Sequence, residues 1–163
     1  MNHQELRDII CSRKPRYNTA FKPLMERIST KGDTSGKGDF STFGAFYQTF
    51  MYAYIIGLRL NKKTPLDCSD KSEFAPIGNW KPSPIRDFII MMLLNESEEF
   101  GARWSDLDDA DEDAIRVLVI EMVKRLEAYA NVGFAYLKEK WDNERYEFND
   151  PFVFVNFLQD LTD

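Results

Sequence analysis

Apolar side chains recur at intervals of three and four residues along most of this chain, and this spacing predicts helices. The strongest pattern covers residues 43–60, which are apolar or aromatic almost all round, as in a central core helix. Ser41 or Thr42 is suited to cap its start. One stripe of this helix is made of small residues, which would admit either another backbone or a ligand. The stripe consists of Ala45, Thr49, Ala53 and Gly57.

Further segments have helical spacing or carry the residues that start helices. They cover residues 3–14, 19–28, 83–95, 111–141 and 151–161. Ser83 followed by Pro84 would start the third of these segments, and the acids at 111–113 complement the dipole of the fourth. The last segment contains the apolar run 152–155, which is equally compatible with a strand.

Together these segments predict an all-α protein, with one domain over residues 1–163 built as a bundle of five or six helices around residues 43–60. A chain of 163 residues with 44% hydrophobic residues is long and apolar enough for one packed core. Residues 31–41 and 61–81 lack periodicity and are expected to be connections. Connections as long as the second one are often functional.

Three features favour a cytoplasmic protein without a membrane contact. The N-terminal residues are polar and lack the apolar core of a signal peptide. Cys11 and Cys68 fit no metal or redox spacing, which suits free thiols in a reducing compartment. The longest uncharged run, residues 43–58, is shorter than the roughly 20 apolar residues that a spanning helix needs.

The charges are divided unequally along the chain, whose net charge is −6. Residues 1–86 contain 14 Lys and Arg against 8 Asp and Glu, whereas residues 87–163 contain 7 against 19. This asymmetry suggests a polyanion or an acidic surface as the partner of the first half and a different partner for the second.

A basic cluster on both sides of the second connection is the best candidate for a binding surface. It consists of Arg59, Lys62, Lys63, Trp80, Lys81 and Arg86. The cations would hold a phosphate near the free N–H groups at Ser83, and the indole of Trp80 would stack on a base. Two other interpretations stay open: the cations complement the dipole at the end of helix 43–60, or the cluster docks a protein.

A dense acidic run precedes and starts the helix at 111–141. It contains Asp106, Asp108, Asp109, Asp111, Glu112 and Asp113. The run lacks the glycine and the glutamate that a calcium-binding EF-hand loop needs at its sixth and twelfth positions. We interpret it as a solvated helix start that favours the dipole, and as a docking surface for a basic protein partner.

We expect no catalytic residues, no cofactor and no metal. Residues 32–38 differ from a phosphate-binding P-loop in their glycine spacing, and no strand precedes them. His3 is the single histidine, which removes His-based catalysis. No acid lies in an apolar stripe, where burial would tune its pKa; Asp87 comes closest and is interpreted as a first-turn acid.

One stretch suggests a family. Residues 43–66, FGAFYQTFMYAYIIGLRLNKKTPL, join an aromatic-rich helix to a short basic turn, and Pro-Ile-Arg-Asp-Phe follows at 84–88. These segments resemble the small accessory proteins found beside bacterial DNA phosphorothioation (sulfur-modification) gene clusters. The resemblance excludes the acidic C-terminal half and carries no catalytic residues. It implies a role in bacterial DNA modification or anti-phage defence through binding.

Three hypotheses of function follow. The first is a non-enzymatic accessory protein of a bacterial DNA-modification or defence system, whose basic half contacts nucleic acid or a DNA-bound partner. The second is a protein–protein interaction module, self-associating or not, without nucleic-acid binding; the acidic sequence pI of about 4.9 favours it. The third is a carboxylate- or lysine-based enzyme.

Overall fold

The computed structural model describes residues 3–29, 43–96, 99 and 103–162. Within this part the chain forms seven α-helices, three short 3₁₀-helices and one sheet of two strands. In chain order they are α1 (His3–Cys11), β1 (Arg16–Asn18), η1 (Thr19–Phe21), α2 (Lys22–Ile28), α3 (Phe46–Leu60), β2 (Lys71–Glu73), η2 (Ile77–Asn79), α4 (Ser83–Asn95), α5 (Trp104–Leu107), α6 (Glu112–Asn143), η4 (Arg145–Asn149) and α7 (Val153–Asp160).

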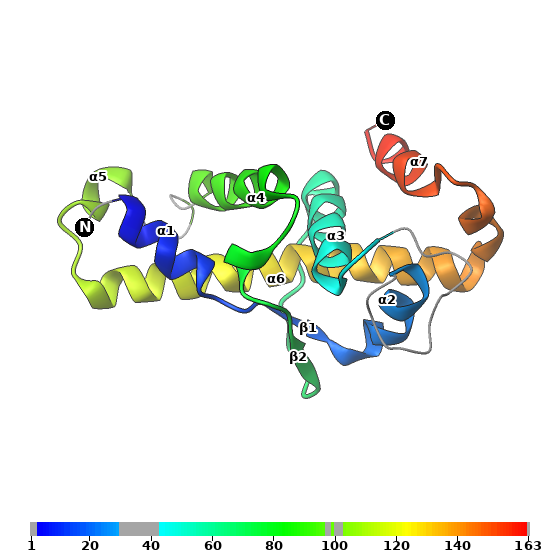
Figure 1. Cartoon of the computed structure of the whole chain (residues 1–163), viewed down its shortest axis with the longest axis horizontal. Helices are drawn as coiled ribbons and strands as arrows, with labels where there is room; N and C mark the ends of the chain where they lie inside the picture. Colours follow the sequence, from blue (N-terminus) through cyan, green and yellow to red (C-terminus); the bar gives the residue numbers. More distant parts are fainter. Residues whose placement is uncertain (1–2, 30–42, 97–98, 100–102, 163) are drawn as a thin grey trace.

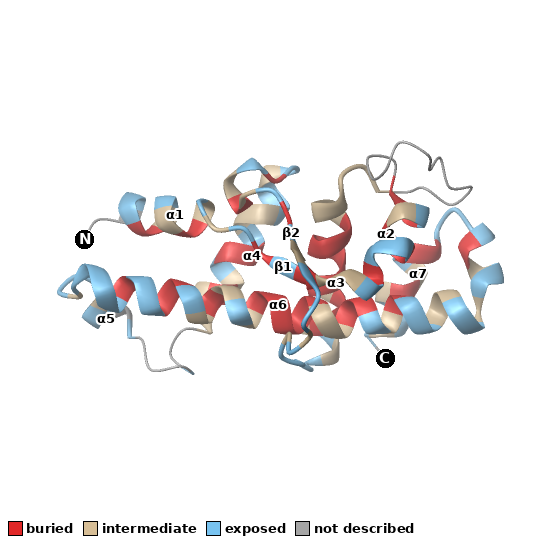
Figure 2. Ribbon diagram, turned by 90° about the horizontal axis from the view of Figure 1, so that it is seen from below, coloured by how far each residue is buried: buried red, intermediate tan, exposed pale blue. Residues whose placement is uncertain are grey.

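Helix α6 is the longest element and runs along the long axis of the molecule (Figure 1). Helices α1 and α4 lie beside its N-terminal half, whereas α2 and α7 lie toward its C-terminal half. Helix α3 stands across the middle of α6 and makes its most extensive contact with it. The buried residues accordingly follow the face of α6 that α3 and its neighbours cover (Figure 2).

The core has two parts, and both include residues of α3 and α6. The larger cluster joins those helices to α1, α4 and η2, and it contains the fully buried Phe50, Tyr54 and Trp80. The smaller cluster joins them to α2, η4 and α7. The prediction of a mainly helical chain is confirmed. A bundle around residues 43–60 is not confirmed, because α6 is the element that runs the length of the molecule.

The backbone of α6 packs closely against the small residues of α3. A Cβ on Gly133 would lie 1.8 Å from the carbonyl oxygen of Ala53, and a Cβ on Gly57 would lie 2.0 Å from that of Tyr129. The two helices therefore approach each other through glycine on both sides. Of the two interpretations of the small-residue stripe, another backbone is the one found at Ala53 and Gly57, and no room remains there for a ligand.

Several boundaries differ from the sequence predictions for local reasons. Helix α3 begins at Phe46 rather than at residue 43, because the N–H of Phe43 donates to the carbonyl of Ile28 in an isolated bridge (2.9 Å). The predicted caps Ser41 and Thr42 lie outside the described residues. Ser83 is the first residue of α4 rather than its cap, which is Pro82.

The sheet was not predicted from the sequence. Strands β1 and β2 pair antiparallel, with Tyr17 opposite Ser72, and three residues each are too few for a period-two pattern. The pairing gives structure to the connection 61–81, which also contains η2. Residues 153–155 of the apolar run lie in helix α7, and Phe152 is its N-cap, so the run does not form a strand. This confirms the predicted helix at 151–161, which begins two residues later than expected.

Candidate functional site

The fold divides the basic cluster that the sequence suggested. The carbonyl of Lys81 accepts a hydrogen bond from Nε2 of Gln48 (3.0 Å), which places Lys81 beside the first turn of α3. Arg59 lies in the last turn of the same helix, where its Nη1 donates to the carbonyl of Leu158 (3.1 Å). At 1.5 Å of rise per residue, Gln48 and Arg59 are about 17 Å apart along the helix. The two ends of the cluster therefore do not form one contact surface.

Trp80 is a core residue and not a stacking surface, so its predicted role is wrong. Its side chain is fully buried, and Nε1 donates to the carbonyl of Ala75 (2.8 Å). Its ring is stacked on Tyr47, with centroids 5.9 Å apart and planes within 5°. Burial of the ring in the larger core cluster removes it from any nucleic acid at the surface.

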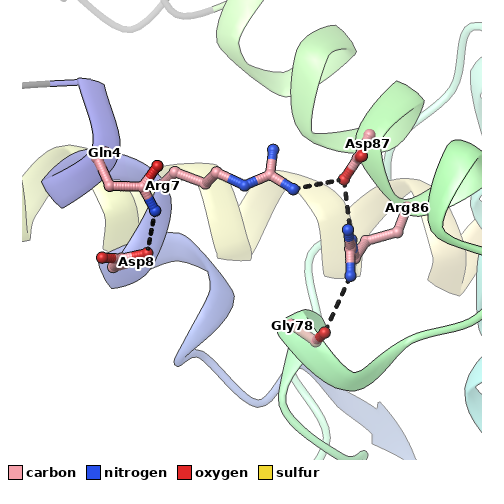
Figure 3. A network of polar contacts seen from close by, with 6 residues as sticks. All are labelled: Gln4, Arg7, Asp8, Gly78, Arg86 and Asp87. Atoms are coloured by element: carbon pink, nitrogen blue, oxygen red, sulfur yellow. Dashed lines mark hydrogen bonds and ion pairs between the residues drawn. The ribbon is translucent and has the colours of Figure 1, made fainter.

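Arg86 is also engaged within the protein (Figure 3). Its Nη1 donates to the carbonyl of Gly78 (3.0 Å), and its Nε contacts Oδ1 of Asp87 (2.9 Å). Arg7 reaches the same oxygen from α1 (2.9 Å). The hydrogen bond from Arg86, together with Arg7, holds the pKa of the Asp87 carboxyl below its ordinary value. Asp87 thus joins α1 to α4, and Arg86 is not available as a phosphate ligand.

The acidic run is exposed and starts α6 as expected. Asp111 caps the helix by accepting a hydrogen bond from the N–H of Ala114 (2.7 Å), and Glu112 pairs with Arg116 (3.2 Å). Within the described residues, no group of His, Cys, Asp or Glu side chains is arranged to hold a metal ion. The role of this run as a protein-docking surface stays a prediction.

Basic side chains gather instead along one side of α6, in a groove that we call the cationic groove. It consists of a cavity of about 700 Å³ and an adjoining cavity of about 370 Å³, which share Arg16, Lys124 and Glu127. The walls come from the connection between α1 and β1, from the residues after α3, from β2 and from α6. The basic side chains in the walls are Arg13, Lys14, Arg16, Lys63, Lys71, Lys124 and Arg125.

Some of these cations are already paired. Arg125 pairs with Glu96 (Nε to Oε2, 2.7 Å) and with Glu99, and Lys124 pairs with Glu121 (2.8 Å). Four others make no ion pair within 4 Å in the described part of the chain: Arg13, Lys14, Lys63 and Lys71. The Nζ of Lys63 lies 5.3 Å over the ring of Tyr129. These four cations are the part of the groove that an anionic ligand can neutralise.

Glu127 lines both cavities of the groove and is a candidate site residue that the sequence analysis missed. Its side chain is only 4% exposed, and Oε1 accepts a hydrogen bond from the backbone N–H of Arg16 (2.9 Å). Burial raises the pKa of its carboxyl, while Arg16 and Lys71 act in the opposite direction. The stripe of Val123, Ala130 and Phe134 around it is the signal that could have identified it.

We expect Glu127→Gln to change the pH dependence of stability. A carboxyl whose pKa is raised on folding keeps its proton in the folded state after the unfolded chain has released it. The wild type should therefore lose stability, relative to Glu127→Gln, as the pH rises from the ordinary glutamate pKa of about 4.3 through the raised value. Urea unfolding of both proteins at pH 4 and pH 8 measures this difference.

Two further variants complete that test. Glu139 is exposed on the same helix, and Glu139→Gln should leave the pH dependence as in the wild type. Glu127→Ala removes the acceptor of the Arg16 N–H and should cost about 1–3 kcal/mol. Parallel pH profiles for the wild type and Glu127→Gln would contradict the raised pKa.

A comparison of the chain with protein-family models, with curated proteins and with solved structures found no match. No helix in the described part of the chain has the length and apolar character needed to cross a membrane. The cationic groove therefore has to be interpreted from its own chemistry.

Proposed function

We propose that this chain is a non-enzymatic binding protein that contacts the phosphate backbone of nucleic acid through the cationic groove. One observation carries the proposal: four basic side chains without ion pairs meet in one groove of a protein whose net charge is −6. They come from segments far apart in the sequence. A concave row of cations along a groove is how proteins follow a single-stranded backbone.

The proposal refines the first hypothesis drawn from the sequence. Lys63 belongs to both the predicted cluster and the groove, whereas Trp80 and Arg86 are engaged inside the protein. The resemblance at residues 43–66 and 84–88 adds a setting to the proposal, namely an accessory role in bacterial DNA modification or anti-phage defence. In that setting the nucleic acid would be DNA.

We expect Lys63→Ala with Lys71→Ala to weaken binding of single-stranded DNA about tenfold at low salt, because two phosphate contacts are lost. The slope of log K against log salt should become shallower by about 1.4, at roughly 0.7 per phosphate contact for a single strand. The matched control is Lys62→Ala with Lys81→Ala, which removes the same charge from exposed positions outside the groove. Fluorescence anisotropy of a labelled oligonucleotide at two salt concentrations measures both variants.

The control decides where the DNA lies. Equal losses in both double variants would show a response to net charge alone and would contradict the groove as the site. A wild-type protein that does not bind DNA at low salt would contradict the proposed function itself.

A protein–protein module is the second candidate function, and an apolar face of α4 favours it. Ile85, Phe88 and Met91 recur at helical spacing and are 38%, 41% and 57% exposed. Exposed apolar side chains grouped on one helix are typical of docking surfaces. A protein that fails to bind DNA but forms stable complexes would support this alternative.

A further inference from the structure

We infer that Glu127 makes the cationic groove selective for bases that carry an exocyclic amino group, so that it binds cytosine in single strands in preference to thymine. The inference rests on the proposed function, since it names the part of the nucleic acid that the same groove recognises. The phosphates would contact the four cations of the groove that make no ion pair, and one base would enter the groove as far as the Glu127 carboxylate.

The carboxylate of Glu127 has an acceptor left for a ligand. Its Oε1 is held by the N–H of Arg16 at 2.9 Å, and the Nε of Arg16 lies 3.7 Å from the same oxygen. Its Oε2 accepts no hydrogen bond from the described residues, although the side chain is only 4% exposed. Oε2 is not one of the fully buried side-chain atoms that lack a partner, so it keeps contact with solvent in the groove, and a donor that enters the groove can reach it.

The size of the groove and the charges around Glu127 suit a nucleotide. A cavity of about 700 Å³ falls in the range of small-ligand sites. Five basic side chains line it, among them Arg16, Lys63 and Lys71, and they outnumber the three carboxylates of Asp67, Glu121 and Glu127. A ligand that binds the Glu127 carboxylate and the cations at the same time needs a hydrogen-bond donor at one end and an anion at the other. A nucleotide with an amino-bearing base has this arrangement.

Base chemistry sets the direction of the preference. Cytosine presents its N4 amino group, which donates to carboxylates, whereas thymine presents the O4 carbonyl at the same place. The O4 carbonyl of thymine would face the Glu127 oxygen. Both are hydrogen-bond acceptors, so they form no hydrogen bond and repel each other. Because the carboxylate is buried, a base stacked in a duplex does not reach it, and an unpaired base can be turned into the groove.

The test compares labelled oligo-dC and oligo-dT of equal length by fluorescence anisotropy at pH 7.5 and low salt. We expect the wild type to bind oligo-dC about tenfold more tightly than oligo-dT. Glu127→Gln should bind both about equally, because its amide can accept from cytosine N4 or donate to thymine O4. Glu121→Gln is the matched control: it removes one negative charge from the same groove and should keep the preference.

The outcomes separate the two proposals. If the wild type binds both oligonucleotides equally, or if Glu127→Gln keeps the preference, the inference is overturned and the proposed function stands. If the wild type binds neither, both are overturned. The preference of the wild type for oligo-dC over oligo-dT can be measured without any variant. If Glu127→Gln proves unstable, Glu127→Asp replaces it: this variant withdraws the carboxylate by one methylene and should lower the preference.

Discussion

Gly133→Ala is expected to lower the free energy of unfolding by about 3 kcal/mol, at the upper end of the usual cost of overpacking. The new Cβ would lie 1.8 Å from the oxygen and 2.4 Å from the carbon of the Ala53 carbonyl. These are backbone atoms of α3, so no side-chain rotation relieves the clash, and the two helices must separate. In an open helix the same substitution would instead stabilise by about 1 kcal/mol.

Urea unfolding followed by circular dichroism measures this effect. Gly44→Ala is the matched control, because its Cβ would meet only a side-chain atom, Oε1 of Gln48 at 2.9 Å. Turning this side chain aside loses at most its hydrogen bonds to the N–H of Gly44 and the carbonyl of Lys81, and no helix has to move. We expect the control to change stability by about 1 kcal/mol or less. Gly57→Ala, whose Cβ would lie 2.0 Å from the Tyr129 carbonyl oxygen, should resemble Gly133→Ala. A Gly133→Ala protein as stable as the wild type would contradict the close crossing of α3 and α6.

Trp80→Ala is expected to cost about 3–5 kcal/mol of stability, the range for removing a large aromatic residue from a core. The indole is fully buried, is stacked on Tyr47 and packs edge-on against Phe50, with centroids 5.6 Å apart. The substitution also leaves the Ala75 carbonyl without its donor at 2.8 Å. Differential scanning calorimetry or urea unfolding measures the loss.

This substitution also separates the two roles that Trp80 has been given. Trp80→Phe keeps an aromatic ring in the core and should cost less than Trp80→Ala, since only the hydrogen bond and part of the volume are lost. A stacking residue at the surface would behave in the opposite way. Trp80→Ala would then keep its stability and lose DNA binding, and that result would contradict the buried position.

The helices could be predicted from the sequence because their signals are local. The expected helix at 111–141 corresponds to α6 (Glu112–Asn143), and the expected helix at 151–161 corresponds to α7 (Val153–Asp160). Both have capping or apolar patterns that span several turns. The strands β1 and β2 could not be predicted, because each has three residues and exists only through pairing with a segment more than fifty residues away in the chain.

The candidate site could be predicted only in small part. Lys63 was among the predicted contacts and lines the cationic groove, but Lys81 lies beside the other end of α3. The sequence shows that Lys63 and Lys81 are basic and lie outside the helices. Their distance from each other depends on how α3 is placed in the fold, which the sequence does not show. Glu127 was missed because the sequence analysis found no acid in an apolar stripe, although Val123, Ala130 and Phe134 recur at helical spacing around it.

The sequence by itself determined that the chain is mainly helical, that α3 is apolar enough to be buried and that the acids at 111–113 start α6. These properties depend on residues within a few turns of one another. Only the tertiary structure decided that α3 and α6 meet through Gly57 and Gly133, that Trp80 is covered and that cations from separate segments share one groove with Glu127. Each of these depends on contacts between residues far apart in the chain, which side-chain periodicity does not encode.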